Sequence, residues 1–135
     1  AMTEPARNMT QSAGTEALTY ILANLHGDVK DIEGSLVISR DGLTMAAHGL
    51  SFDIDSAGAV CTELYGQGGA LANELQRGQV HEVLLRTEHG YVLVVPAGEE
   101  LYLALLARAD ANLGLLFLEI HRTAEAVAAT LTRKG

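Results

Sequence analysis

Two neighbouring apolar runs in the C-terminal half of the chain constrain its fold more than any other feature. Residues 92–95 read Val-Leu-Val-Val, and residues 101–107 read Leu-Tyr-Leu-Ala-Leu-Leu-Ala. A strand with one solvated face alternates apolar and polar side chains, and neither run does so. Both runs are therefore predicted to be strands of a sheet that is covered on both faces.

Three further β-rich runs complete the predicted sheet. The first two flank Arg40-Asp41-Gly42, a turn signal that is typical of a β-hairpin. The third precedes Glu88-His89-Gly90, and Pro96-Ala97-Gly98 separates the two apolar runs. The predicted strands are residues 34–39, 43–47, 80–87, 91–95 and 101–107, the last three of them in an antiparallel meander.

Three segments repeat apolar residues at helical spacing. The first begins at Thr15, a candidate N-cap, and ends near Gly27, with apolar positions Leu18, Ile21, Leu22 and Leu25. The last covers Asn112–Thr132 and has Asp110 or Asn112 as its candidate cap. Its apolar positions are Leu113, Leu116, Phe117, Ile120, Ala124, Val127 and Leu131.

The middle segment is the longest predicted helix and carries two stripes. It begins after Asp53 or Asp55 and ends at Gly78, and the stripe expected to face the core is Ala57, Val60, Cys61, Leu64, Gly68, Leu71 and Leu75. A second stripe, at i, i+4, i+7 and i+11, consists of the small residues Thr62, Gly66, Gly69 and Asn73.

Glycine costs a helix about 1 kcal/mol relative to alanine, so the small-residue stripe calls for a physical reason. Such a stripe lets another helix approach closely, and an antiparallel copy of the same helix across a two-fold axis is the simplest neighbour. The alternative is a break in the helix near Gly68, because short glycine runs often end helices.

The predicted element order is αββαβββα, an α/β (α+β) domain with a five-stranded antiparallel sheet and helices on both faces. Residues 1–14 lack apolar periodicity, which predicts a disordered leader before a domain over residues 15–135. Two helices would fill one face of the sheet, and the third would leave the other face half bare. A second copy of the chain could supply the missing cover.

Composition favours a protein partner over nucleic acid or a membrane. The chain has 135 residues, of which 48% are hydrophobic and 19% charged. No apolar run approaches the roughly 18 residues of a membrane span. With 17 acidic against 9 basic residues, the net charge of -8 repels polyanions and is compatible with a basic patch on a protein. The single cysteine, Cys61, and the lack of a signal-peptide pattern predict a cytoplasmic location.

No motif predicts a catalytic residue, a metal site or a cofactor. The five histidines form neither an i, i+4 pair nor an HExxH motif. Cys61 lies in the apolar stripe and is interpreted as a core residue rather than a nucleophile. The chain contains no GxSxG and no GxxxxGKS/T motif, and its glycine-rich run 66–70 lies inside a helical pattern instead of following a strand. We expect a non-enzymatic protein without a phosphate loop.

The hairpin Gly34–Leu43 resembles the signature hairpin of the roadblock / dynein light chain family. The element order resembles the fold of that family over about Thr15 to Leu131. This resemblance implies a homodimer in which two second helices lie antiparallel on a sheet that is joined through the third strands. The dimer interface would then include Thr62, Tyr65, Gly66, Gly69, Asn73, Val80, Val83 and Leu85.

Among bacterial members, the chain looks similar to MglB-type proteins that bind a small Ras-like GTPase of the MglA type. This similarity implies an adaptor that regulates or scaffolds a GTPase docked on the paired helices, at Glu63, Glu74 and Arg77. Arg77 and Arg86 lie near the expected platform, but no feature marks either as an arginine finger.

A small-molecule sensor of similar mixed α/β architecture is an alternative function, and an enzyme of another kind is a third. A sensor would need an internal pocket with convergent polar groups. The strand interiors are aliphatic, and only 4% of the residues are aromatic, which favours a filled core.

Overall fold

The computed structural model describes residues 3–132 and contains three helices and five strands in the predicted order αββαβββα. The helices are α1 (Thr3–Asp28), α2 (Ile54–Glu74) and α3 (Leu113–Thr132). The strands are β1 (Ile32–Ser39), β2 (Thr44–His48), β3 (Val83–Thr87), β4 (Gly90–Ala97) and β5 (Leu101–Ala107). The predicted fold class is confirmed.

All five strands form one antiparallel sheet in the order β2-β1-β5-β4-β3. The two apolar runs that the sequence placed in a covered sheet are β4 and β5, which lie inside this sheet. The turn Arg40-Asp41-Gly42 joins β1 to β2, and Gly42 adopts φ +93°, a conformation that glycine tolerates best. β2 and β3 are the two edge strands.

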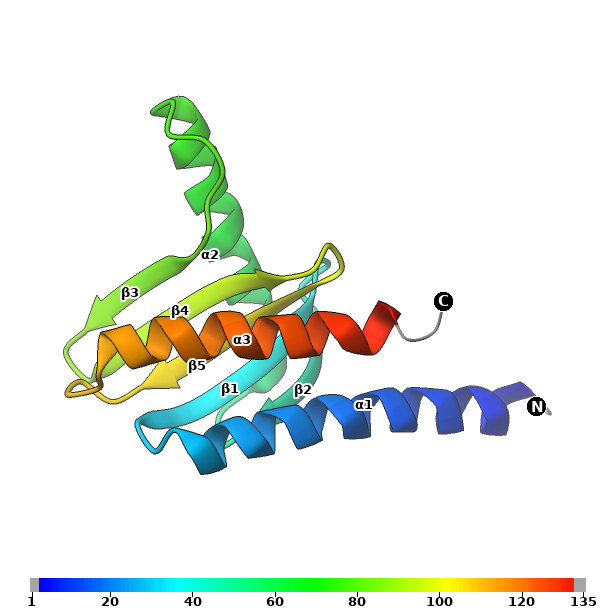
Figure 1. Cartoon of the computed structure of the whole chain (residues 1–135). Coiled ribbons are helices and arrows are strands. Elements are labelled where there is room, and N and C mark those ends of the chain that lie inside the picture. The colour runs from blue at the N-terminus through cyan, green and yellow to red at the C-terminus, as the bar shows by residue number, and fades with distance from the viewer. Residues whose placement is uncertain (1–2, 133–135) are drawn as a thin grey trace.

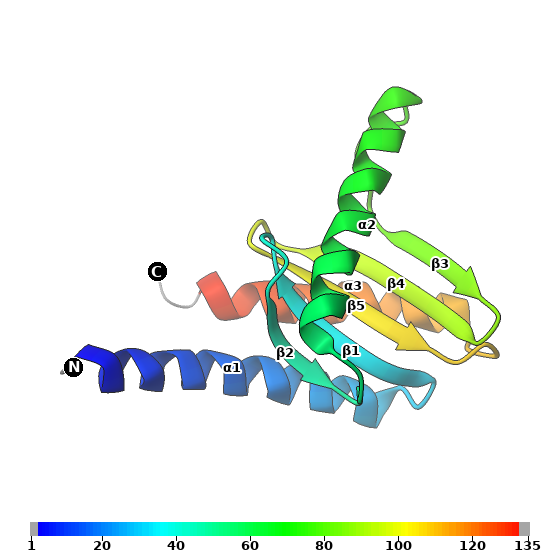
Figure 2. The same ribbon diagram turned by 180° about the vertical axis from the view of Figure 1, so that it is seen from behind.

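The helices divide unequally between the two faces of the sheet (Figures 1 and 2). α1 and α3 lie side by side on one face, where Leu22, Leu103 and Ile120 belong to the larger core cluster. α2 lies on the other face, over a smaller cluster that contains Leu36, Ile38 and Val94. The prediction of two helices on one face and one on the other is confirmed.

The start of the first helix differs from the prediction. α1 begins at Thr3, so Thr15 lies inside the helix and does not cap it. Residues 3–14 are mostly polar and carry no apolar stripe, but most of them are compatible with helix, and a proline in the first turn is tolerated. The predicted leader therefore overlaps α1, except for residues 1 and 2, which lie outside the described residues.

α2 runs without a break through the glycine-rich run and ends at Glu74, four positions before the predicted stop at Gly78. Asp53 is its N-cap, and its side chain accepts hydrogen bonds from the backbone N–H groups of Asp55 and Ser56. The interpretation of a helix break near Gly68 is thereby excluded.

Part of the predicted core stripe of α2 was wrong. Val60, Leu71 and Leu75 are 59%, 59% and 56% exposed, whereas Cys61 and Leu64 do pack against the core of the α2 face. The spacing of apolar residues shows which side of a helix is apolar. It does not show whether that side packs on the sheet of the same chain or remains exposed.

The cap of α3 follows the prediction, whereas the start of β3 does not. The side chain of Asn112 accepts a hydrogen bond from the Leu115 N–H at 3.1 Å. Of the two candidate caps of α3, Asn112 is therefore the N-cap. β3 begins at Val83 rather than Val80. Within residues 3–132, no helix combines the length and the apolar character needed to cross a bilayer.

Candidate protein-interaction surface on α2 and β3

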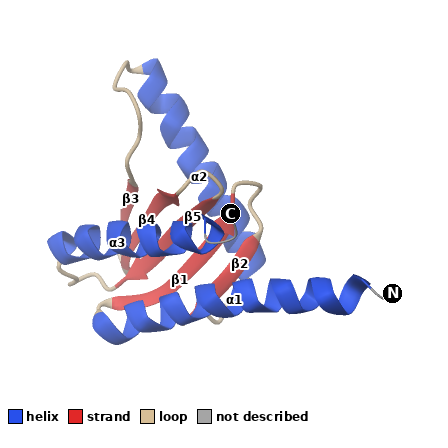
Figure 3. Cartoon of the chain, turned by 45° about the vertical axis from the view of Figure 1, so that its right-hand side comes forward, coloured by secondary structure: helices blue, strands red, loops and turns tan. Residues whose placement is uncertain are grey.

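The C-terminal half of α2 projects beyond the sheet, and the following loop returns to edge strand β3 (Figures 1 and 3). Gln76 has φ +57° and Gly78 has φ +83°, which gives the sharp reversal that brings the chain back. Among the described strands, β3 pairs only with β4, so within residues 3–132 its other edge has no strand partner for its backbone donors and acceptors. We call Gly66–Thr87 the arm.

One flank of α2 faces β3. Leu64, Gly68, Leu71 and Leu75 fall at i, i+4, i+7 and i+11, which places them on one side of the helix. A Cβ atom added to Gly68 would lie 3.0 Å from Cγ2 of Val83 in β3. This contact fixes the direction of the whole flank toward the sheet edge.

The flank and β3 together expose an apolar surface. Leu85 pairs with Val92, which packs against the core of the α2 face, so Leu85 lies on the same side of the sheet as α2. Leu85 is 46% exposed. We define the arm surface as the half-buried or exposed apolar residues Leu71, Leu75, Val83 and Leu85 of the arm, together with Val60 and Leu64, which precede the arm on the same flank of α2.

The small-residue stripe lies on the opposite flank of α2. The hydroxyl of Thr62 lies 3.8 Å from a Cβ added at Gly42, so this flank faces the β1–β2 turn. Added Cβ atoms at Gly66 and Gly69 would meet nothing within 4 Å. Packing within the chain therefore does not require a glycine at either position.

Tyr65 anchors the arm to the rest of the fold. Its hydroxyl donates a 2.6 Å hydrogen bond to the carbonyl of Val80, and its ring centroid lies 5.0 Å from that of Tyr102. Arg40 stacks on the ring of Tyr102, and its guanidinium carbon lies 4.3 Å from the centroid of that ring. Burial, followed by Tyr102, raises the pKa of Tyr65, so the hydroxyl stays a donor at neutral pH. Tyr65 and Val80 thus bond to each other inside the chain.

The three residues predicted to bind a partner are all exposed, at the outer side and the end of α2. Glu63 and Glu74 are separated by three helical turns and so share one side of the helix. Within the described residues, neither carboxylate forms an ion pair. Arg77 follows the helix, and its backbone N–H donates to the carbonyl of Ala72 at 2.8 Å.

The described residues offer little for covalent or metal chemistry. Burial raises the pKa of the Cys61 thiol, which disfavours the nucleophilic thiolate. No three His, Cys, Asp or Glu side chains in the described part of the chain are grouped so that they could hold a metal ion.

The sequence also matches a known domain family. Residues 18–107 match the model of the Roadblock/LC7 domain, from the first helix to the end of β5. The chain belongs to the Roadblock/LC7 family. It is 35% identical over 99 residues to the uncharacterised protein MJ1340 of Methanocaldococcus jannaschii, an alignment that covers 73% of this chain and 86% of the relative.

Two solved structures from the same group of folds agree with this assignment. A Roadblock/LC7 domain from Streptomyces avermitilis is 26% identical with a TM-score of 0.79, over 84% of this chain and 97% of that one. The gliding protein MglB from Thermus thermophilus is 24% identical with a TM-score of 0.78, over 87% of this chain and 90% of that one. The suspected resemblance to roadblock proteins and MglB is confirmed at the level of fold.

The sequence did not predict the exposed apolar flank of α2. The spacing assigned Leu71 and Leu75 to the core, and the interface expected on α2 consisted of Thr62, Tyr65, Gly66, Gly69 and Asn73. A signal was available, since the helix carried more apolar positions than the short strands beneath it could cover. Only the position of α2 relative to β3 shows which flank of α2 stays exposed.

Proposed function

We propose that the chain is a non-enzymatic adaptor that forms a homodimer and binds a small Ras-like GTPase of the MglA type, which it regulates or scaffolds in the cytoplasm. The observation that supports this proposal is the arm surface. It exposes leucines on a helix and on an unpaired edge strand of a protein that carries a net charge of -8. Membership of the Roadblock/LC7 family and the likeness to MglB support it further.

The proposed dimer joins the two β3 edges and packs the two α2 helices antiparallel. An unpaired edge strand can accept a strand from another copy, and a two-fold axis satisfies both edges at once. The same arrangement would remove Leu71, Leu75 and Leu85 from water. Of the interface residues expected from the sequence, Val83 and Leu85 belong to this surface, whereas Thr62, Gly66, Gly69 and Asn73 lie on the other flank of α2.

The proposed GTPase site is the outer side of the paired helices, at Glu63, Glu74 and Arg77. Two helices held across a symmetry axis form a rigid surface that can dock a folded partner. Unpaired carboxylates on that surface favour a partner with a basic patch.

Calorimetric titration tests the partner. The dimeric chain is titrated with each small Ras-like GTPase encoded in the same genome, loaded either with GDP or with a non-hydrolysable GTP analogue. One GTPase is expected to bind in at least one nucleotide state. Glu63→Lys and Glu74→Lys are expected to weaken this binding several-fold, because each change reverses a charge that faces the basic partner.

Glu125→Lys is the matched control, because Glu125 is an exposed residue of α3 on the other face of the sheet. It should leave the affinity unchanged. If Glu125→Lys is the damaging substitution, or if none of the GTPases binds, the proposed site or the proposed partner is wrong.

A further inference from the structure

The free edge of β3 presents three alternating side chains to the α3 face of the sheet. Leu84 and Arg86 pair with two residues of β4 that belong to the larger core cluster, beneath α1 and α3, so their side chains lie on that face. Glu82 precedes the strand and reaches the same face, because its Oε1 atom lies 2.8 Å from Nε2 of His121 in α3. The edge therefore carries an acidic, an apolar and a basic side chain in order.

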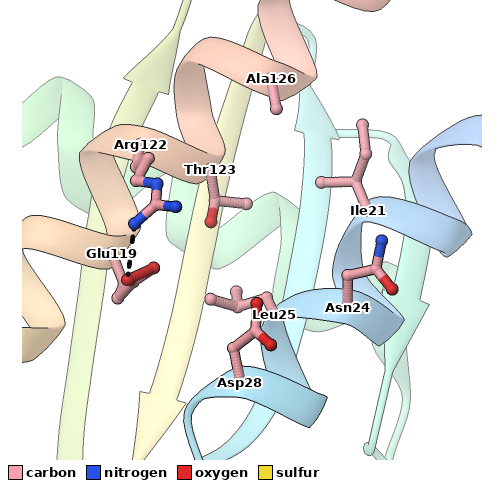
Figure 4. A pocket seen from close by; sticks show the side chains of 8 residues that line it. All are labelled: Ile21, Asn24, Leu25, Asp28, Glu119, Arg122, Thr123 and Ala126. Atoms are coloured by element: carbon pink, nitrogen blue, oxygen red, sulfur yellow. Dashed lines mark hydrogen bonds and ion pairs between the residues drawn. The ribbon is translucent and has the colours of Figure 1, made fainter.

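The two charges at this edge are available to another molecule. Arg122 has a carboxylate partner, since it lies 3.3 Å from Glu119 beside the pocket between α1 and α3 (Figure 4). Arg86 is exposed and forms no ion pair within residues 3–132. Glu82 contacts His121, whose ring carries a charge only when it is protonated. Four residues of strand span about 13 Å, so Glu82 and Arg86 of one chain cannot pair with each other.

A second copy of the chain meets strict geometric limits at this edge. The homodimer of the proposed function joins two β3 strands antiparallel about a two-fold axis. An axis perpendicular to the sheet keeps both α2 helices on one side, so residues directly opposite each other come from the same face. Each allowed register then places one residue of β3 opposite its own copy, on the axis.

With Leu84 on the axis, the side chains match on both faces of the joined sheet. Glu82 of each copy lies opposite Arg86 of the other, and opposite charges in directly opposed positions attract each other. On the α2 face, Val83 lies opposite Leu85, which places apolar surface against apolar surface. All opposed pairs at the centre of the joined edge are therefore complementary.

The two neighbouring registers match less well. An axis at Val83 would set the carboxylate of Glu82 opposite Leu84, where it would lose contact with water without gaining a partner. An axis at Leu85 would set Glu82 opposite Glu88, and like charges directly opposite each other are destabilising. The side chains thus favour one register among those that backbone hydrogen bonding alone would allow.

We propose that a second copy of the chain docks on β3 in the register that has Leu84 on the two-fold axis, fixed by two ion pairs between Glu82 of one copy and Arg86 of the other. This inference rests on the homodimer of the proposed function and adds which residue of the second copy each edge residue meets. The contact with His121 uses one carboxylate oxygen of Glu82 and leaves the other for the arginine.

Disulfide formation between copies tests the register, in the full chain with Cys61→Ala so that each variant has a single thiol. Leu84→Cys should give a covalent dimer under mild oxidation, because the Cα atoms of an opposed pair are about 4.5–5.5 Å apart, within the range that a disulfide spans. Val83→Cys and Leu85→Cys should link much more slowly, because each thiol is displaced from its own copy by two residues along the strands.

Charge reversal tests the ion pairs. Glu82→Arg alone and Arg86→Glu alone should each raise the dissociation constant of the dimer about tenfold, because like charges then face each other at two sites. An equal mixture of the two variants should form a heterodimer, because every arginine at the joined edge then faces a glutamate. Glu99→Arg, at an exposed position between β4 and β5, makes the same change in net charge and should leave the dissociation constant unchanged.

The outcomes separate this inference from the proposed function. A dimer that links fastest through Val83→Cys or Leu85→Cys, or that links through none of the three cysteines, overturns the register while the homodimer stands. A mixture of the charge variants without preference for the heterodimer overturns the ion pairs. An original chain that is monomeric by light scattering overturns the proposed homodimer, and the register with it.

Discussion

His26 lies where α1 meets the first hairpin, and its contacts tie three elements together. Its Nε2 atom is 2.9 Å from the hydroxyl of Ser35 in β1, and its ring centroid is 4.2 Å from that of His48 in β2. Burial, and then the nearby His48, lower the pKa of His26 from its ordinary value of 6.5. The folded protein therefore resists protonation of this side chain.

This lowered pKa makes stability depend on pH. Below about pH 6.5 the unfolded chain takes up a proton at His26 before the folded chain does, so the free energy of unfolding falls as pH falls through this range. The loss stops below the folded pKa, where both states are protonated. Urea unfolding at several pH values between about 7.5 and about 5.5 measures the effect, because this range spans the ordinary histidine pKa.

His26→Gln is the matching variant, since glutamine can bond to Ser35 without titrating. Its stability is expected to change less with pH than that of the original chain. His89 is highly exposed, with 91% of its side chain in contact with solvent, so His89→Gln should keep the original dependence. Identical pH profiles for all three proteins would contradict the assignment to His26.

Tyr65 gives a second prediction at the residue scale. Tyr65→Phe removes the hydrogen bond to the Val80 carbonyl and should lower the free energy of unfolding by about 1 kcal/mol. Tyr20→Phe is the control, because Tyr20 is 68% exposed, and its effect should stay within about 0.5 kcal/mol. Denaturant unfolding at one fixed protein concentration compares the two. Equal effects would mean that the bond to Val80 does not hold the arm.

At the scale of elements, glycines have two different roles in α2. A Cβ atom at Gly58 would collide with the hydroxyl of Thr44 in β2, which donates a 2.6 Å hydrogen bond to the carbonyl of Ile54. Gly58 therefore lets the start of α2 approach the hairpin. Gly66, by contrast, faces open space.

Alanine substitutions separate these roles. Gly58→Ala should destabilise the chain by about 1–3 kcal/mol, because the methyl group forces β2 and α2 apart. Gly66→Ala should be neutral or stabilising by up to about 1 kcal/mol, because alanine is the better helix former. The midpoint of urea unfolding reports both. A neutral Gly58→Ala would show that α2 does not need this close approach.

The sequence predicted the elements well because each has a local cause. β4 and β5 lack alternation, the hairpin has its Asp-Gly turn, and Asp53 and Asn112 cap their helices. The candidate site was predicted less well. Leu71 and Leu75 have the spacing of a core stripe, and only the direction of α2 over the sheet shows that the stripe faces outward near its end.

At the scale of the whole molecule, the sheet has one face filled by two helices and one face only partly covered by α2 (Figures 1 and 2). The arm extends from the uncovered side and exposes leucines that the chain itself cannot bury.

The last prediction concerns this dimer. Light scattering after size exclusion should give a mass near twice the 14.3 kDa of one chain. Leu71→Asp or Leu85→Asp should give a folded monomer, because a carboxylate would then be buried in the apolar contact between copies. Leu118→Asp is the control, since Leu118 is equally apolar and 61% exposed on α3, and it should leave the dimer intact.

Gly69→Leu distinguishes the two flanks of α2: dissociation by this change, with Leu71→Asp still dimeric, would assign the contact to the small-residue stripe. A monomeric original chain at tens of micromolar would remove the basis of the adaptor model.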